Sequence, residues 1–530
     1  MRTATTIAIV TVSMVFFMTP QASADGLAVG VPHESIGTVF DGGAANVIYG
    51  TADGLTVTGS QMWNQDTAGI PGMSEDSDQF GLALISGDFD GNGRGDLAIG
   101  VPKESIGDAE DAGLVHVLYA DGAGVLTADG TQWWYQGLND LIGTPDSGDE
   151  FGGSLAAGDF NGDGFDDLAI AAAGEDVGGE TEAGAVHIIY GSASGLISTG
   201  NQVWNQASPG IHGVAEGGDH FAETLAVGDF DGDGIDDLAI GSPFEELGGI
   251  DGAGTVHVLY GSPSGITSDD NYFWSDPWVV QEFANFGSSL AAGDLNGDGR
   301  DDLAIGAPDM TIWGEAYAGT ATVLYGSEIG LSTLGFQTLA QGADCQGFSI
   351  QDTYESSDRF GYALAIGDFD GDDRDDLAIS APGESIGSTD LAGVVHILFS
   401  NATGLTGEDN QLWHQGLSSV GWYVEYGDRF GKSLAAGDFN EDGTDDLAVG
   451  VPFESFNSLS AAGLVHIFYG GSGGPSSGLE VWSQDGDVPG EPEDYECFGT
   501  SLAAIKSLSR QVFADGFESG NMTAWSLAID

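Results

Sequence analysis

Residues 151–170 have the sequence FGGSLAAGDFNGDGFDDLAI, and the fold can be inferred by working outward from them. The stretch holds a Phe-Gly pair, a short apolar run, an acidic loop from Asp159 to Asp167 and a second apolar run, Leu168-Ala169-Ile170. Two more short runs follow, at residues 186–190 and 202–206, each after a turn rich in glycine or serine. Short β-branched or aromatic runs bounded by Gly, Asp, Asn and Ser are typical of strands. The stretch therefore predicts one unit of four strands.

This unit recurs about every 70 residues along the chain. Its opening phenylalanine recurs seven times, at Phe80, Phe151, Phe221, Phe286, Phe360, Phe430 and Phe498. Glycine follows each of them except Phe221, which Ala222 follows. After the acidic loop comes a Gly-x-Pro element or a close variant, at residues 30–32, 100–102, 171–173, 241–243, 306–308, 380–382 and 450–452.

The two series are out of phase by one unit. The first Gly-x-Pro, at residues 30–32, has no Phe-Gly before it, and the last Phe-Gly, at Phe498, has no Gly-x-Pro after it. One unit is therefore shared between the two ends of the repeat array. Such sharing closes a ring and hides the strand edges that an open array would expose. We predict an all-β fold, a seven-bladed β-propeller of four-stranded blades closed by N- and C-terminal segments in one blade.

Six acidic loops follow one template, with oxygen-bearing side chains at positions one, three, five and nine. Position seven varies, as expected if only its carbonyl is a ligand, and position six is Gly in five loops. Oxygen ligands spaced around a sharp turn suit Ca²⁺, and the absence of His and Cys from the loops argues against zinc. An EF-hand would need a Glu at position twelve and flanking helices, whereas a strand follows here. We predict about six Ca²⁺ sites, with these ligands: Asp88, Asp90, Asn92, Arg94, Asp96; Asp159, Asn161, Asp163, Phe165, Asp167; Asp229, Asp231, Asp233, Ile235, Asp237; Asp294, Asn296, Asp298, Arg300, Asp302; Asp368, Asp370, Asp372, Arg374, Asp376; Asp438, Asn440, Asp442, Thr444, Asp446.

The repeat resembles the FG-GAP repeat of integrin α-subunit propellers and of many exported bacterial proteins. The Phe-Gly, acidic-loop and Gly-x-Pro elements carry the resemblance, which covers residues 25–508. It implies a seven-bladed propeller that binds calcium and serves adhesion or ligand binding. Ala222, the segment 171–173 and the missing acidic loop of the shared unit depart from the pattern.

The two ends of the chain lie outside the repeat. Residues 1–24 are predicted to be a signal peptide, because an apolar run from Ile7 to Met18 precedes the small residues Ala22-Ser23-Ala24. We therefore expect a secreted, cell-surface or periplasmic protein cleaved near Ala24. No other segment is apolar over the length that a membrane span needs. Residues 509–530 form a C-terminal tail whose role the sequence does not identify.

The charge balance limits the choice of partners. The chain has 83 Asp and Glu against 10 Lys and Arg, a formal net charge of −73. A surface this acidic repels nucleic acid and anionic membranes, so we expect neither as a partner. We expect a monomer that binds an extracellular protein or glycan. Cys345 and Cys497 are the only cysteines, and whether they form a disulfide is left open.

Two other features allow either a structural or a ligand-binding interpretation. Glu34, Glu104, Glu175, Glu245, Glu384 and Glu454 recur after the Gly-x-Pro element, and we predict inter-blade hydrogen bonds for them on the face opposite the acidic loops. Arg94-Gly95-Asp96 is an RGD tripeptide, but Asp96 is assigned to a calcium loop and so is not free for a partner.

Enzyme signatures are absent, so an adhesion or ligand-binding scaffold is the leading hypothesis. The alternative is a propeller enzyme, a lyase or hydrolase acting on polysaccharide. A unique site should break the repeat, and the irregular stretches are residues 276–285, 309–318 and 341–357.

Overall fold

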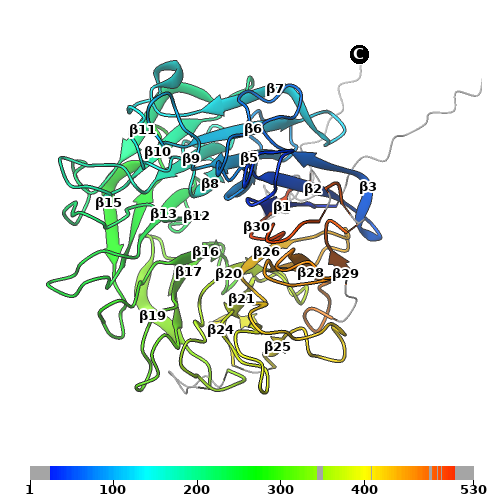
Figure 1. The fold of residues 1–530 in the computed structure, drawn as a ribbon. Helices are drawn as coiled ribbons and strands as arrows, with labels where there is room; N and C mark the ends of the chain where they lie inside the picture. The colour runs from blue at the N-terminus through cyan, green and yellow to red at the C-terminus, as the bar shows by residue number, and fades with distance from the viewer. Residues whose placement is uncertain are drawn as a thin grey trace, which may run out of the picture.

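The computed structural model describes residues 24–342, 350–407, 409–476, 480–485, 488–490 and 492–507. Within them lie seven four-stranded antiparallel sheets, arranged as blades around a central axis (Figure 1). The only helix in these ranges is a single 3-10 turn, Leu138–Asp140. The predicted seven-bladed β-propeller is confirmed. The expected signal peptide (except Ala24), the tail 509–530 and Cys345 lie outside the described residues.

Blade I is built from both ends of the chain. It contains β1 (Gly26–Val31), β2 (Ala44–Thr51), β3 (Gly54–Trp63) and β30 (Ser501–Ile505). Strand β30 pairs antiparallel with β1, from Gly26 opposite Ile505 to Gly30 opposite Ser501. The unit that the sequence divides between its ends is therefore one blade, as predicted.

The other six blades are continuous in sequence. Blade II contains β4 (Leu84–Gly87), β5 (Asp96–Val101), β6 (Leu114–Ala120) and β7 (Leu126–Trp134); blade III contains β8 (Leu155–Gly158), β9 (Asp167–Ala172), β10 (Ala185–Tyr190) and β11 (Ile197–Trp204); blade IV contains β12 (Thr224–Gly228), β13 (Asp237–Ser242), β14 (Thr255–Tyr260) and β15 (Thr267–Trp274). Blade V contains β16 (Ser289–Gly293), β17 (Asp302–Ala307), β18 (Thr320–Tyr325) and β19 (Ser332–Leu339); blade VI contains β20 (Leu364–Gly367), β21 (Asp376–Ala381), β22 (Val394–Leu398) and β25 (Gln411–Trp413); blade VII contains β26 (Ser433–Gly437), β27 (Asp446–Val451), β28 (Leu464–Phe468) and β29 (Glu480–Trp482). A separate small hairpin of β23 (Ser400–Asn401) and β24 (Gly404–Leu405) lies within the blade VI segment.

The first strands of the blades form the inner ring. Each first strand contacts the first strand of the next blade, in the order β4, β8, β12, β16, β20, β26 and β30, and β30 in turn contacts β4. The apolar core lies between neighbouring blades: one cluster joins Phe230 and Val256 of blade IV to Leu303 and Ile305 of blade V. Each blade therefore depends on the next for burial of its apolar faces.

The Phe-Gly pair lies where adjacent blades approach each other closely. Phe360 is fully buried, and Gly361 has a φ of +87°. A Cβ added to Gly361 would lie only 2.3 Å from the carbonyl oxygen of Thr320. A side chain there would be strained and would meet backbone. Ala222, the one exception in the series, also adopts a positive φ of 76°.

The recurring glutamates link six of the seven blades to the blade before, as predicted. Oε2 of Glu104 in blade II accepts a hydrogen bond from Nε2 of Gln65 in blade I, 2.6 Å away. Five more pairs repeat this bond: Gln136–Glu175, Gln206–Glu245, Gln341–Glu384, Gln415–Glu454 and Gln484–Glu34. At the remaining junction both partners differ, because Met310 replaces the glutamate and Asp276 takes the place of the glutamine. These glutamates follow the second strand and the acidic loops precede it, so the two sets lie on opposite faces.

Candidate metal centres

Each acidic loop joins the first and second strands of a blade. Its ninth residue is the first residue of the second strand, as Asp96 is of β5 and Asp237 is of β13. The six loops of blades II to VII therefore gather at one end of the propeller. Blade I has no such loop, because its first strand, β30, comes from the other end of the chain.

The aspartate at position nine is a fully buried carboxylate. In blade IV, Oδ2 of Asp237 accepts from the backbone N–H of Phe230 at 3.0 Å, and Oδ1 accepts from that of Gly261 at 2.9 Å. Burial, together with the charges of Asp231 and Asp229, raises the pKa of Asp237 to about 8. The pKa rises to about 8 for the same reasons at Asp96, Asp167, Asp302, Asp376 and Asp446. A cation beside such a carboxylate would favour its ionised form, because an opposite charge offsets the cost of burial.

The earlier loop positions are held by the backbone of the turn. In blade IV, Asp229 accepts hydrogen bonds from the N–H groups of Asp233 and Gly234, at 3.0 and 2.9 Å. Asp231 accepts from Asp233 at 3.1 Å, and Asp233 accepts from Ile235 at 2.9 Å. Both oxygens of Asp229 and one oxygen each of Asp231 and Asp233 are thus held by the loop itself, which orients the carboxylates without an ion.

Three of the loops bring three carboxylates together. Ligand oxygens lie within 4.8 Å of one another in the groups Asp88–Asp90–Asp96, Asp229–Asp231–Asp237 and Asp368–Asp370–Asp376. This spacing and the all-oxygen donor set fit a hard divalent cation.

The other three loops have Asn at position three. Nδ2 of Asn161 lies 3.3 Å from Oδ2 of Asp167, and Nδ2 of Asn296 lies 3.2 Å from Oδ2 of Asp302. Asn440 makes the corresponding contact with Asp446 at 3.5 Å. A half-turn of the amide would place its oxygen where the nitrogen now lies, so these loops can also offer only oxygen donors to a cation, with one negative charge fewer.

Position seven is more constrained than its variable sequence suggests. In blades III to VII its side chain packs on the glycine at position four of the preceding loop, as Phe165 packs on Gly91 and Arg300 packs on Gly232. In the last loop Glu441 takes that glycine's place, and the next blade has no loop to press on it. The sequence-based expectation that this side chain varies freely therefore misses its packing role between loops.

Sequence reasoning also missed the aspartate at position eight, which clamps neighbouring loops together. Oδ2 of Asp166 accepts from the backbone N–H of Asp88 at 2.7 Å, while the N–H of Asp166 donates to the carbonyl of Asp88 at 3.2 Å. Asp236, Asp301, Asp375, Asp445 and Asp25 repeat the arrangement around the ring. The repeated Asp-Asp doublet before the second strand was the available signal.

The clamps surround a hollow of about 490 Å³ near the axis of the propeller. Five of the six clamp aspartates and Lys506 line it. Burial, with the neighbouring carboxylates, raises the pKa of Asp236 to about 6 and that of Asp375 to about 7.

The RGD tripeptide is not presented at the surface. Arg94 is 7% exposed and Asp96 is not exposed at all. The side chains that an adhesive tripeptide would offer to a partner are therefore inside the propeller.

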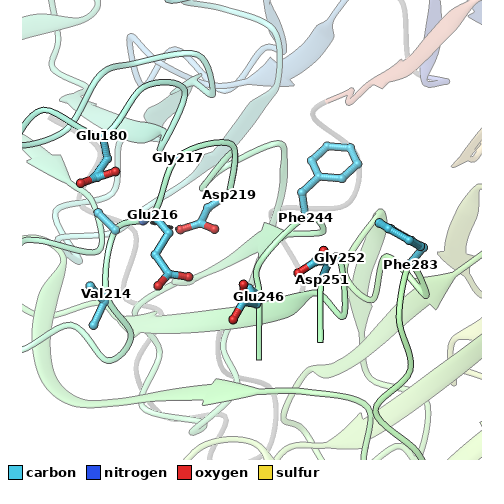
Figure 2. A pocket seen from close by; sticks show the side chains of 11 residues that line it. Glu180, Val214, Glu216, Gly217, Asp219, Phe244, Glu246, Asp251, Gly252 and Phe283 are labelled. Carbon is cyan, nitrogen blue, oxygen red and sulfur yellow. Dashed lines mark hydrogen bonds between the residues drawn. The ribbon is translucent and has the colours of Figure 1, made fainter. Parts of the chain in front are cut away.

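The face that carries the Gly-x-Pro elements has its own hollows. One of about 550 Å³ lies between blades III and IV, and carboxylates wall it (Figure 2). Glu180, Glu216, Asp219, Glu246 and Asp251 surround it together with Phe244 and Phe283. No helix among the described residues is long and apolar enough to cross a membrane.

Comparison with protein families finds the FG-GAP repeat six times in this chain. The matches cover residues 80–118, 151–189, 221–259, 286–324, 360–398 and 430–468. Each begins at a Phe-Gly or Phe-Ala pair and includes one complete acidic loop.

Curated relatives match part of the chain. Human phosphatidylinositol-glycan-specific phospholipase D is 35% identical over 249 residues, which is 46% of this chain and 27% of the relative. Integrin alpha-5 of Xenopus laevis is 31% identical over 240 residues, 44% of this chain and 20% of the relative. Integrin alpha-PS2 of Drosophila melanogaster is 29% identical over 240 residues, 44% of this chain and 15% of the relative. The chain thus spans about a quarter or less of the length of these relatives.

Solved structures resemble the chain more distantly. The Pseudomonas aeruginosa periplasmic gluconolactonase PpgL has a TM-score of 0.43 and 15% identity, with 91% of this chain and 99% of that chain covered. A Bacillus licheniformis rhamnogalacturonan lyase has a TM-score of 0.30 and 12% identity, with 80% and 74% covered.

Proposed function

The chain is an FG-GAP repeat protein, and on that premise we propose that it is an exported, calcium-stabilised propeller that serves as an adhesion or ligand-binding scaffold. The single observation that carries this proposal is the set of six buried aspartates at position nine, each beside other carboxylates in a preformed loop. Ca²⁺ suits these loops because it takes six to eight oxygen ligands in flexible geometry. Bound there, it supplies positive charge that offsets the buried carboxylates.

The role of the loops in this proposal is structural. Each loop is clamped to the next by a position-eight aspartate, so a cation in one loop also stabilises a blade junction. A ligand that binds only the folded state stabilises that state by mass action. The opposite face, which has hollows of its own and the irregular loops, is then free to bind a partner.

Export supports the same proposal from the sequence. The apolar run and small residues before Asp25 suit a signal peptide, and calcium sites of millimolar affinity are loaded where calcium is abundant. Detection of the mature chain outside the cytoplasm, with Asp25 near its N-terminus, is the expected result. A chain that stays in the cytoplasm uncleaved would contradict this part.

The test of scaffold against enzyme is a paired assay on the calcium-loaded protein. A glycan array measures binding, and incubation with the bound glycans, followed by product sizing, measures cleavage. The scaffold proposal predicts binding with no change in glycan length. Shortened products would instead favour the polysaccharide lyase or hydrolase that the sequence left as the alternative.

A further inference from the structure

Basic side chains are rare in this protein, yet three of them line one hollow. The chain has ten Lys and Arg against 83 Asp and Glu. Arg359, Arg429 and Lys432 lie around a hollow of about 400 Å³, together with Tyr317 and Tyr362. Chance placement would scatter so few cations, so their meeting at one place calls for a physical explanation.

The repeat explains how they come together. The residue before each opening phenylalanine has a positive φ, 58° at Arg359 and 54° at Arg429. The N–H of Arg359 donates to the carbonyl of Tyr317 at 2.9 Å, and that of Arg429 donates to the carbonyl of Leu391 at 3.1 Å. Two equivalent positions in neighbouring blades VI and VII are thus held by the same backbone contacts, and their side chains share one hollow.

The other five blades carry different residues at this position. They are Gln79, Glu150, His220, Asn285 and Cys497, all with positive φ. A similar contrast holds two residues after each phenylalanine, where blades VI and VII have Tyr362 and Lys432, and the other blades have Leu82, Gly153, Glu223, Ser288 and Thr500. The backbone conformation at the first of these positions is the same in every blade, whereas the arginine, tyrosine and lysine side chains occur there only in blades VI and VII.

Two of the three cations have no carboxylate partner in the described part of the chain. Arg359 pairs with Asp309, Nε to Oδ1, at 3.2 Å. The guanidinium of Arg429 lies 5.2 Å from the ring centre of Phe453, and the ammonium of Lys432 lies 4.1 Å from the ring centre of Tyr362 and contacts its hydroxyl. By contrast, Lys103 and Arg374 each contact a carboxylate. An unpaired cation among so many acids marks a place where an anion can bind without displacing an existing partner.

Lys432 keeps its positive charge less readily than an exposed lysine does. Burial, with the charge of Arg359, lowers the pKa of Lys432 to about 8. An incoming anion would favour the charged form of Lys432, because an opposite charge nearby offsets the cost of burial.

An exposed aromatic side chain lies on the same loop as Tyr317 and contacts two further aromatic rings. The loop between β17 and β18 carries Tyr317, which lines the hollow, and Trp313, which is 61% exposed. The ring of Trp313 lies 5.1 Å from that of Tyr354 and 6.3 Å from that of Trp278, which is 46% exposed. These residues come from the irregular stretches that break the repeat. Flat, exposed aromatic faces beside polar groups suit the apolar face of a sugar ring.

We propose that this hollow, which we call the basic hollow (Tyr317, Arg359, Tyr362, Arg429 and Lys432), binds the anionic group of an acidic oligosaccharide. Arg429 and Lys432 hold the carboxylate or sulfate, and the row Trp278, Trp313 and Tyr354 supports neighbouring sugar rings. A hollow of about 400 Å³ falls in the range of small-ligand sites. This inference rests on the proposed function as a binding scaffold and names its ligand class.

The test is calorimetric titration of the calcium-loaded, full chain at fixed free Ca²⁺ and salt. The probes are a galacturonate trisaccharide, a sulfated neutral trisaccharide and an unmodified neutral trisaccharide. We expect one or both acidic sugars to bind at least about tenfold more tightly than the neutral one, and the tighter of the two identifies carboxylate or sulfate as the anion. Arg429→Gln and Lys432→Gln should each weaken acidic-sugar binding by about tenfold, since each removes one charge-assisted contact. Trp313→Ala should weaken it by a smaller factor.

The matched control is Lys103→Gln, which removes a cation that is already paired with carboxylates. It should leave acidic-sugar binding unchanged, and melting curves of every variant confirm that the fold is kept. The inference is overturned if neither acidic sugar binds at about 10 mM, if the neutral sugar binds equally well, or if both Arg429→Gln and Lys432→Gln bind normally. An acidic peptide, triglutamate, serves as a further probe. If it binds as tightly as the acidic sugars, the assignment of a sugar as the ligand is overturned.

Calcium removal from the same samples separates the two proposals. If calcium removal leaves the melting temperature unchanged while the acidic sugar still binds, calcium stabilisation is contradicted and the proposal for the basic hollow is supported. If calcium removal lowers the melting temperature but no acidic sugar binds to the calcium-loaded protein, calcium stabilisation is supported and the proposal for the basic hollow is contradicted.

Discussion

The backbone N–H of Gly95 donates a hydrogen bond to the carbonyl oxygen of Lys506, 3.2 Å away, and this bond completes the ring of blades. At the other loop junctions an aspartate makes the equivalent bond to the first residue of the preceding loop, as Asp166 does to Asp88. In blade I that first residue is Lys506, and Gly95 replaces the aspartate of blade II. A Cβ on Gly95 would lie 2.8 Å from the Lys506 oxygen, so the C-terminal strand leaves no room for a side chain there.

Truncation before β30 should open the ring. Removal of residues 498–530 deletes the strand that pairs with β1, exposes the edge of β1 and takes away the inner-ring neighbour of β4 and β26. We expect aggregation or loss of the folded state, because unpaired edges and unburied apolar faces are then exposed. Size-exclusion chromatography and thermal melts measure this. The matched truncation of residues 509–530 should remain monomeric and melt as the full chain does; the same behaviour from the longer truncation would refute ring closure by β30.

The offset between Phe-Gly and Gly-x-Pro was enough to predict this closure, because strand order in a repeat follows from sequence order. The gathering of the position-nine aspartates with other loop carboxylates agrees with the spacing of the acidic template, and their role as calcium ligands stays a prediction. The clamp of Asp166 on Asp88 was not found, although the Asp-Asp doublets were visible, because it joins residues 78 apart in different blades. The basic hollow also escaped notice: Arg359 and Arg429 lie 70 residues apart, and only the ring brings them together.

Glu245→Gln should stabilise the protein at high pH but not at low pH. Burial, with the charge of Asp219, raises the pKa of Glu245 to about 8, against about 4.3 in an unfolded chain. The folded protein therefore holds this proton more tightly, and the resulting stability is present below the unfolded pKa and is lost as pH rises to about 8. Glutamine keeps the oxygen that accepts from Gln206 and carries no charge.

The measurement is the melting temperature of both proteins at pH 5 and pH 8 in saturating calcium. We expect equal values at pH 5 and an increase of at least about 2 °C for the variant at pH 8. Glu246→Gln, which removes an exposed neighbouring charge, is the control and should show little change at either pH. An equal effect of Glu245→Gln at both pH values would show that its charge is not the cause.

Asp96→Asn should remove one metal site. Asp96 is buried with two backbone donors on its carboxylate, and it is the ninth residue of the blade II loop. Loss of its charge should lower the calcium count by about one and lower the melting temperature. Arg94→Gln, two residues away, should keep the full calcium count, since only the carbonyl of that residue is expected to bind.

The same pair of variants tests the RGD tripeptide. Because Arg94 and Asp96 are both buried, we expect no attachment to an integrin-coated surface from the unaltered protein or from either variant. Attachment that disappears in Arg94→Gln while calcium binding stays normal would contradict the burial of this tripeptide in solution.

The most direct test of the account is the number of calcium ions bound per folded chain, measured together with their effect on unfolding. We predict about six Ca²⁺ per chain, with site affinities on the order of 10⁻⁴ to 10⁻³ M. At ten times its dissociation constant each site adds about 1.4 kcal/mol to the stability of the folded state, so chelation should lower the melting temperature by more than about 5 °C. Six ions with a large chelator effect would support calcium as the partner of the buried aspartates. A folded chain that binds none, and melts at the same temperature with and without chelator, would contradict it.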